Sequence, residues 1–299
     1  MSYHEPVLLK EAIEAMNIKP GGIYVDATFG GGGHSKTILK KLTRGKLYAF
    51  DQDEDAEKNS PADKKFVLIQ SNFRYIKRFM RYHDALPVNG ILADLGISSH
   101  QIDTPERGFS IRHDAPLDMR MNAEQKMTAA DVVNSYEEEK LVRIFSEYGE
   151  VENAKRVSAQ IVSIRKSKAI ETTKQLIDAI DKYVDKRFPS KYLAKIFQAL
   201  RIEVNDEINA LKDFLMQSTE ILGAGGRLVV ISYHSLEDRL VKNFLRSGKF
   251  EGDAEKDVFG NEMNVPFQSL TRKPIVPSEI ETQNNPRAKS ARMRIGEKL

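Results

Sequence analysis

The stretch from Ile23 to Ser35 reads I-Y-V-D-A-T-F-G-G-G-G-H-S and decides the fold of this 299-residue chain. It begins as a short apolar run typical of a strand, turns through four glycines, and leads into the helical pattern of residues 35–42. Glycines let the backbone approach a bound molecule closely, and free N–H groups at a helix N-terminus attract its polar groups. The segment therefore predicts a ligand-binding turn between a strand and a helix.

Three classes of ligand compete for this turn. A dinucleotide fingerprint requires G-x-G-x-x-G, and both frames fail because Ser35 and Lys36 stand where the last glycine is needed. A phosphate loop requires G-x-x-x-x-G-K-[ST], and residues 30–37 depart from it only at Ser35. The third class is the S-adenosylmethionine (SAM) loop of a methyltransferase, in which an acidic strand end precedes a glycine turn. The loop alone leaves these classes, and a plain tight turn, open.

The order of elements predicts an α/β fold. After the first strand, short apolar runs at 46–51, 66–69, 91–96 and 225–232 read as strands, and most are separated by helical patterns. Strands that alternate with helices form a parallel sheet with helices on both faces. The alternating tail at 291–295 reads as a further, half-exposed strand, and residues 248–264 read as a loop.

The middle of the chain has a different character. Strand patterns are missing from 106 to 197, where 129–145, 154–164 and 173–184 read as amphipathic helices, with Thr128 and Thr172 as plausible caps. A further helix is expected over 195–222. We therefore predict a helical domain at 106–197, inserted into an α/β domain formed by 1–105 and 198–299.

Three acids follow strands of the predicted sheet, namely Asp26, Asp51 and Asp94. Open parallel sheets bind ligands beyond the carboxyl ends of their strands. Asp51 lies 21 positions after Gly30, where a carboxylate can accept hydrogen bonds from an adenosine ribose. A phosphate-loop protein needs no acid there, so Asp51 disfavours the ATPase interpretation. Asp94 also resembles the end of a Walker B strand and does not discriminate.

Composition limits the classes of protein that remain. The chain has no cysteine, which excludes disulfides, cysteine zinc sites and thiol catalysis, and no histidine pair has metal-ligand spacing. No signal peptide or membrane-spanning run is apparent, so we expect a cytoplasmic protein with no metal and no membrane partner. The net charge is only +3, but residues 153–200 carry eleven bases against four acids. That asymmetry suits a polyanion, although a solvated helical surface explains it equally well.

The segment after the fifth predicted strand is a second site candidate. Tyr233, His234 and Ser235 lie at a carboxyl end and are rich in polar groups. The competing interpretation is a helix start, with Ser235 as the cap and Asp238 at the third helical position.

Several motifs together resemble the MraW/RsmH family nearly from end to end. They are His4–Leu9 (H-E-P-V-L-L), Asp26–Ser35, Asp94–Gln101 (D-L-G-I-S-S-H-Q), Gly108–Ser110, Pro116–Met121, Gln198–Asn205 (Q-A-L-R-I-E-V-N), Ser232–Arg239 (S-Y-H-S-L-E-D-R) and Asn285–Arg287. That family consists of bacterial SAM-dependent methyltransferases that modify the exocyclic N4 of a cytidine in the decoding region of 16S ribosomal RNA.

The resemblance implies a fold, a cofactor and a set of site residues. It implies a class I, Rossmann-like methyltransferase sheet, SAM as methyl donor with S-adenosylhomocysteine (SAH) as product, and RNA recognition by the helical insert. The implied SAM contacts are Gly32, Gly33, His34, Asp51, Phe73, Asp94 and Gln101. As catalytic candidates we take Asp94 to polarise the amine, and Tyr233, His234 and Ser235 to hold the base, with Phe109 or Tyr233 as stacking partner.

The expected activity is therefore N4-methylation of a cytidine in 16S rRNA of the small ribosomal subunit. Two other functions stay open at this stage. One is a phosphate-loop NTPase that acts as a ribosome assembly factor, and the other is an RNA-binding module without catalysis. The sequence indicates no oligomeric state.

Overall fold

The computed structural model describes residues 6–260 and 262–299 and divides the chain into two compact units. One unit comprises 1–96 with 208–299, and the other comprises 97–207. The second unit thus begins nine residues before the predicted insert and ends ten residues after it. His4 and Glu5 of the first family motif lie outside the described residues.

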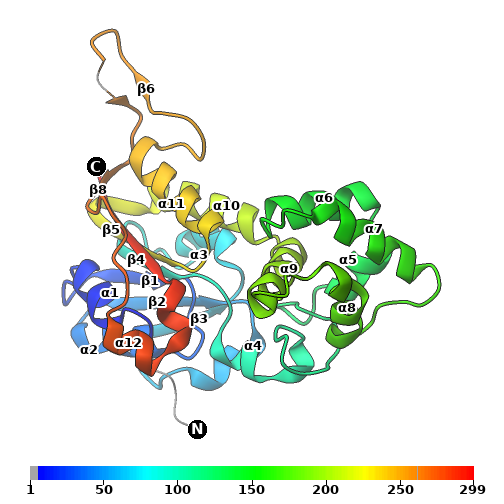
Figure 1. Cartoon of the computed structure of the whole chain (residues 1–299). Coiled ribbons are helices and arrows are strands. Elements are labelled where there is room, and N and C mark those ends of the chain that lie inside the picture. Colours follow the sequence, from blue (N-terminus) through cyan, green and yellow to red (C-terminus); the bar gives the residue numbers. More distant parts are fainter. Residues whose placement is uncertain (1–5, 261) are drawn as a thin grey trace. The chain divides into compact units, whose positions relative to one another are not determined.

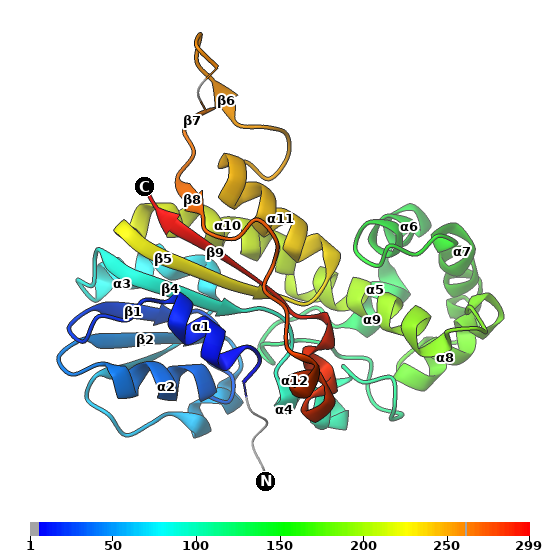
Figure 2. The same cartoon turned by 60° about the vertical axis from the view of Figure 1, so that its left-hand side comes forward.

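The first unit is built on a seven-stranded sheet with the order β3-β2-β1-β4-β5-β9-β8 (Figures 1 and 2). Strands β1 to β5 run parallel, whereas β9 is antiparallel to β5 and β8. The strands are β1 (Ile23–Asp26), β2 (Lys46–Asp51), β3 (Phe66–Gln70), β4 (Val88–Asp94), β5 (Leu222–Ser232), β8 (Phe267–Ser269) and β9 (Arg292–Lys298). The predicted strands are confirmed, and this order, which reverses between β1 and β4, is that of a Rossmann-like sheet.

Helices cover both faces of this sheet, as Figures 1 and 2 show. Side chains alternate along each strand, so Val25 and Ile91 point into one apolar core and Tyr24 and Leu92 into the other. The first core is closed by α3 (Ile76–Tyr82), α10 (Glu207–Ile221) and α11 (Ser235–Ser247). The second is closed by α1 (Leu9–Ala15), α2 (Gly33–Lys41) and the turn η5 (Pro286–Ser290), with α12 (Glu279–Asn284) before it. Short turns η1 (Glu54–Asn59) and η2 (Phe73–Tyr75) complete the unit.

Residues 248–264, expected to be a loop, contain a short antiparallel ribbon. Its strands are β6 (Glu255–Lys256) and β7 (Glu262–Met263). The sequence prediction missed it because two-residue strands carry no periodicity.

The second unit is helical and has its own apolar core. Its elements are α4 (Ser99–Asp103), η3 (Pro105–Arg107), α5 (Ala129–Ser135), α6 (Glu138–Glu147), α7 (Ala154–Arg165), α8 (Thr173–Ile180), η4 (Asp181–Tyr183) and α9 (Pro189–Asn205). Thr128 and Thr172 cap α5 and α8 with reciprocal capping boxes, as predicted.

Two predicted helices are each divided in the structure. The stretch expected as one helix over 129–145 forms α5 and α6, which are separated by extended backbone at Tyr136 and Glu137. The stretch expected over 195–222 forms α9 and α10, because Asp206 adopts a left-handed conformation with φ of 50°. Aspartate tolerates that conformation better than most residues, and apolar periodicity does not reveal it. No helix among residues 6–260 and 262–299 is long and apolar enough to cross a membrane.

A buried ion pair connects strand β9 to helix α11. Arg294 on β9 donates two hydrogen bonds to Asp238 on α11, at 2.6 and 3.0 Å, and both side chains are buried. A buried charge that loses its partner is costly, because neither water nor another group replaces it.

Replacing Asp238 by alanine is therefore expected to lower the free energy of unfolding by about 3–5 kcal/mol. Asp253→Ala, which breaks the exposed pair with Arg246, is the matched control and should cost under about 1 kcal/mol. Urea unfolding followed by circular dichroism measures both. Equal, small losses for the two variants would show that the buried pair contributes little.

Candidate functional site

The site residues of the first unit gather at the carboxyl edge of the sheet. Asp26, Asp51 and Asp94 are the last residues of β1, β2 and β4, and Tyr233 follows the end of β5. The strand order reverses between β1 and β4, which is where sheets of this kind form a ligand crevice. The sequence placed these acids at strand ends, and the parallel pairing brings the three strand ends side by side.

The glycine turn between β1 and α2 needs its glycines for steric reasons. Gly32 caps α2 with a φ of 73°, and a Cβ there would lie 2.9 Å from the ring of Phe29. A Cβ on Gly33 would lie 2.1 Å from Cγ of Pro6. The turn is tied to the sheet because the N–H of Phe29 donates to the carbonyl of Phe50 at 2.8 Å.

The helix start contradicts a phosphate loop. In that motif the lysine and threonine lie at the beginning of the helix, where they meet the phosphates. Here α2 already begins at Gly33, so Lys36 and Thr37 come after its first residues. The hydroxyl of Thr37 donates to the carbonyl of Gly33 within the helix. The likeness to a Walker sequence is therefore coincidental.

Asp26 is a fully buried carboxylate that local donors hold. The hydroxyl of Ser35 donates to its Oδ2 at 2.6 Å, and the N–H of Thr28 donates to Oδ1 at 3.2 Å. Burial raises the pKa of Asp26 to about 6, although both hydrogen bonds oppose the shift. Ser35 thus stands where a phosphate loop has a glycine, and its hydroxyl connects α2 to the end of β1.

Asp51 shapes the glycine turn from the neighbouring strand. Its Oδ2 accepts the N–H of Gly30 at 2.8 Å, and its Oδ1 accepts the N–H of Asp53 at 2.9 Å. Burial raises the pKa of Asp51 to about 6. Each carboxylate oxygen has two lone pairs, so both can accept a further hydrogen bond from a ligand hydroxyl.

Asp94 joins three elements at the centre of the edge. Its Oδ1 accepts the hydroxyl of Tyr233 at 2.7 Å, and its backbone N–H donates to the hydroxyl of Thr28 at 2.6 Å. Burial raises the pKa of Asp94 to about 6, and burial together with the Asp94 charge keeps the pKa of Tyr233 well above its usual value. Tyr233 is therefore a neutral hydrogen-bond donor at neutral pH. Sequence reasoning missed Thr28, whose only signal is its place two residues after a strand-end acid.

His34 faces Asp94 from the start of α2. Its Nδ1 lies 3.9 Å from Oδ2 of Asp94, and its Nε2 lies 3.1 Å from the carbonyl of Val7. Burial lowers the pKa of His34, so the ring is neutral. Since the carbonyl of Val7 can only accept, Nε2 carries the proton and Nδ1 is an acceptor. Two acceptors thus face one another, and a ligand N–H group would satisfy both.

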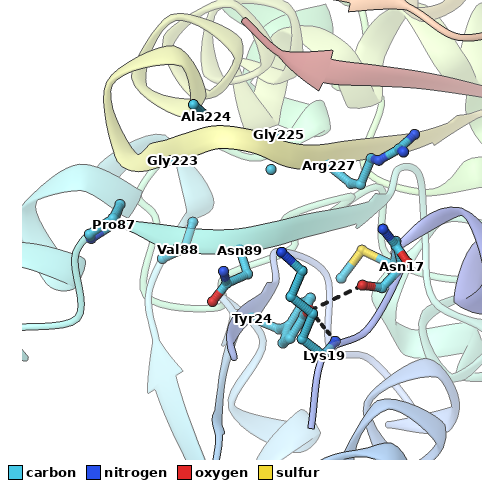
Figure 3. Close-up of a pocket in the computed structure, with 12 residues that line it drawn as sticks. Asn17, Lys19, Tyr24, Pro87, Val88, Asn89, Gly223, Ala224, Gly225 and Arg227 are labelled. Atoms are coloured by element: carbon cyan, nitrogen blue, oxygen red, sulfur yellow. Dashed lines mark hydrogen bonds between the residues drawn. The ribbon is translucent and has the colours of Figure 1, made fainter. Parts of the chain in front are cut away.

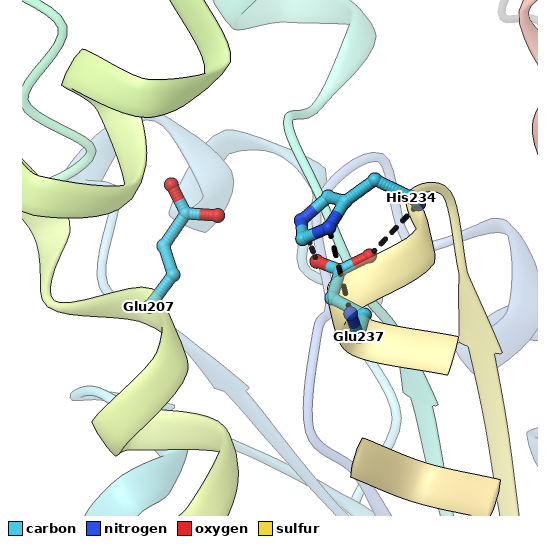
Figure 4. A group of neighbouring side chains, drawn as sticks. All are labelled: Glu207, His234 and Glu237. Carbon is cyan, nitrogen blue, oxygen red and sulfur yellow. Dashed lines mark hydrogen bonds and ion pairs between the residues drawn. The ribbon is translucent and has the colours of Figure 1, made fainter. Parts of the chain in front are cut away.

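The segment after β5 is held by Glu237, which sequence reasoning did not select. Its buried carboxylate accepts the N–H of Tyr233 at 2.9 Å, and its Oε1 lies 3.1 Å from Nε2 of His234 (Figure 4). The predicted helix cap was wrong by one residue, because His234 caps α11 and Glu237 occupies the third helical position. An imidazole nitrogen can accept a backbone hydrogen bond as a serine hydroxyl does. Ser235 is exposed on the first turn of α11.

The remaining predicted residues have different surroundings. Phe73 lies in η2, half-buried, with its ring edge-on to Phe214 at 5.3 Å between centroids. Gln101 belongs to the helical unit, where it is buried and forms a capping box with Ser98. Phe109 is packed in the core of the helical unit, so it is not available as a stacking partner for a base.

A cavity of about 240 Å³ opens at the opposite, amino edge of the sheet (Figure 3). It is lined by the first residues of β4 and β5 and by Tyr24, whose hydroxyl bridges the backbone of Asn17 and Lys19. Open parallel sheets bind their ligands at the carboxyl edge, so this cavity is not the predicted ligand crevice.

Comparisons with known proteins show the family to which the chain belongs. A model of the MraW methylase family matches residues 1–299. The chain is 58% identical over 298 residues to the ribosomal RNA small subunit methyltransferase H of Cytophaga hutchinsonii, with 99% of each chain covered. It is 55% identical over 300 residues to the protein of that name in Flavobacterium johnsoniae, covering 100% of this chain and 99% of the relative. A solved structure of a methyltransferase from Streptococcus mutans in complex with SAH aligns over 100% of both chains at 14% identity, with a TM-score of 0.45.

The Asp26–Ser35 hydrogen bond yields a pH-dependent prediction. The folded-state pKa of Asp26, about 6, exceeds the ordinary value of 3.8, so ionisation of this carboxyl costs stability as the pH rises between the two. Ser35→Ala removes a donor that the ionised form needs. The free energy of unfolding should fall by about 1–3 kcal/mol at pH 8 and by less at pH 5, where Asp26 is protonated. Urea unfolding at the two pH values measures this, and Ser167→Ala, an exposed serine, is the control. A loss that does not change with pH would contradict the assignment.

Proposed function

Because the chain belongs to the MraW methylase family of SAM-dependent methyltransferases, we propose that it methylates the exocyclic N4 of a cytidine in the decoding region of 16S ribosomal RNA. The names of its relatives at 53–58% identity support a substrate in the RNA of the small ribosomal subunit. The base and the atom that receives the methyl group are our inference. The observation that carries it is the Asp94–Tyr233 pair beside a neutral His34.

The carboxyl edge of the sheet fits the methyl donor. The close packing of Phe29 and Pro6 against the turn requires glycine at positions 32 and 33, and Asp51 offers two acceptor oxygens for the ribose hydroxyls. Bound SAM supplies a methyl group on a sulfonium that leaves as a neutral thioether, so the leaving group requires no general acid.

The acceptors around Asp94 suit an amine. Oδ2 of Asp94 and Nδ1 of His34 are both acceptors, 3.9 Å apart, so this position favours a group that brings N–H donors. The exocyclic amine of cytosine is such a group, and the ammonium of SAM is another. With a pKa of about 6, Asp94 is mostly ionised at neutral pH and can accept the hydrogen bond.

The proposed catalysis rests mainly on positioning. The N4 lone pair of cytosine is delocalised into the ring, so the nitrogen must be aligned with the methyl group and water must be excluded. Well-oriented transfers gain up to about 7–11 kcal/mol from positioning. Asp94 accepts a hydrogen bond from N4–H and so increases the electron density on the nitrogen, while the hydroxyl of Tyr233 keeps the Asp94 carboxylate in place. As the bond from N4 to the methyl carbon forms and the bond from that carbon to sulfur breaks, the surplus N4 proton passes to the Asp94 carboxylate, which later releases it to solvent. His234 and Ser235, at the start of α11, are further candidates for holding the base.

The helical unit is our candidate for RNA recognition. Lys166, Lys168 and Lys174 are exposed on it, at the end of α7 and the start of α8. Cations that neutralise phosphates release counterions, so binding through them weakens steeply with salt. The target base must be unstacked, which costs least in a single-stranded loop.

The two alternative functions are less well supported. A phosphate-loop NTPase would need a glycine before Lys36, where this chain has Ser35, whose hydroxyl is bonded to Asp26. An RNA-binding module without catalysis would have no use for one buried and two half-buried carboxyls with raised pKa values, which are costly to keep in a folded protein.

Calorimetry separates the ligands. SAM and SAH should each bind the purified protein, and ATP should give no heat. Asp51→Asn should weaken SAM binding about 10- to 100-fold, because a carboxylate accepts stronger hydrogen bonds than an amide. Asp55→Asn, at a half-exposed position in η1, is the control and should bind as the wild type does. A heat of binding with ATP would instead support the phosphate-loop NTPase.

Methyl transfer tests the function itself. With labelled SAM and small-subunit RNA, either naked or in the subunit, the wild type should yield N4-methylcytidine in digests analysed by mass spectrometry. Asp94→Asn should lower kcat about 10²- to 10⁴-fold, and Tyr233→Phe less, because the carboxylate remains. Measuring the dissociation constant of SAM for Asp94→Asn separates a role in catalysis from a role in cofactor binding. An unchanged kcat with weaker SAM binding would mean that Asp94 contacts only the cofactor. A different methylated nucleoside would refute the proposal.

A further inference from the structure

Phe188 stands out on the surface of the helical unit. It is 63% exposed, and among residues 97–207, all of them described, no other large apolar side chain is exposed to this degree. The side chain precedes α9, where Pro189 is the first helical residue. A single exposed apolar residue needs no explanation by itself, so the backbone that carries Phe188 and the residues around it must be considered.

The backbone beneath Phe188 is well fixed. Its N–H donates to the carbonyl of Asp185 at 3.2 Å, and its carbonyl accepts the N–H of Tyr192 at 3.0 Å. The hydroxyl of Tyr192 in turn donates to Asn153 at 2.6 Å, which ties α9 to the start of α7. The ring is therefore presented by a turn and a helix start that are both hydrogen-bonded, so binding would cost little backbone entropy.

Three cationic residues lie within three positions of Phe188 in the sequence. Lys186, Arg187 and Lys191 are all exposed. Lys186 pairs with Asp181 at 2.8 Å and Arg187 with Asp185 at 3.2 Å, but these pairs lie in solvent and contribute little to stability. A phosphate group could exchange for either carboxylate at small cost, and it would gain from the net positive charge of the segment.

We propose that Phe188 is a stacking platform for one unpaired nucleobase, with the adjacent phosphates held by Lys186, Arg187 and Lys191. An aromatic ring among cations is what single-stranded nucleic acid requires, because every base has a π-face and every nucleotide a charge. A protein partner is the poorer fit, since lysine is depleted in protein interfaces. This inference rests on the proposed function and adds a contact residue to its RNA-binding surface.

The chain contains no tryptophan, which provides a direct test. In Phe188→Trp the introduced indole is the only one, and its fluorescence should be quenched when a single-stranded ribo-oligonucleotide or 16S rRNA is added. Phe188→Ala should weaken RNA binding about 5- to 100-fold. The slope of log affinity against log salt should not change, because no charge is lost. Lys186→Glu with Arg187→Glu should reduce that slope.

Tyr82→Ala is the matched control, because Tyr82 is 82% exposed on the first unit and also follows an arginine. It should bind RNA as the wild type does, and unchanged unfolding midpoints should accompany both alanine variants. If the wild type binds small-subunit RNA but Phe188→Ala binds equally well and the indole is not quenched, the platform is refuted while the proposed function stands. If the wild type binds neither free small-subunit RNA nor the small subunit itself, the proposed function fails and the platform with it.

Discussion

The burial of three carboxyls at neighbouring strand ends is the constraint on which the rest of the site depends. Asp26, Asp51 and Asp94 all have a pKa raised to about 6 by burial. Part of the shift at Asp51 and at Asp94 comes from the charge of Asp26, which raises the pKa of both. Like charges in a region of low dielectric are expensive, so each carboxyl needs its own donors. Those donors are the groups that shape the site.

The glycine turn also supplies hydrogen bonds that stabilise two of these carboxyls. Asp51 accepts the N–H of Gly30, and Asp26 accepts the hydroxyl of Ser35, so both ends of the turn are held by neighbouring strands. Asp94 takes the hydroxyl of Tyr233 from beyond β5. The same hydrogen bonds that make the buried acids tolerable therefore also fix the backbone and the side chains that a methyl donor and an amine would contact. Fixed polar groups of this kind favour catalysis by positioning.

The second unit is our candidate for RNA recognition, and it exposes charged side chains to solvent, whereas the carboxyl edge of the sheet in the first unit keeps its acids largely out of solvent. Its apolar core leaves the lysines of α7 and α8 in solvent. Phe188 differs from the other large apolar residues of that unit in staying outside the core. Charge alone tells little about such a surface, since solvated helices are often basic. An aromatic ring on a hydrogen-bonded backbone, next in sequence to Lys186 and Arg187, is a more specific feature.

The sequence alone determined the order of the five parallel strands and of β9, the helical character of the middle of the chain, the carboxylates at strand ends and the family. Alternating apolar runs, glycine turns and acids are local patterns, and parallel strands bring their carboxyl ends to one edge. Only the tertiary structure decided which groups meet there. His34 and Asp94 face one another 60 positions apart, and Glu237, rather than Ser235, organises the segment after β5. The left-handed Asp206 and the packing of Phe109 in a core likewise carry no periodic signal. These features depend on contacts between distant residues and on single backbone angles, and neither follows from local sequence.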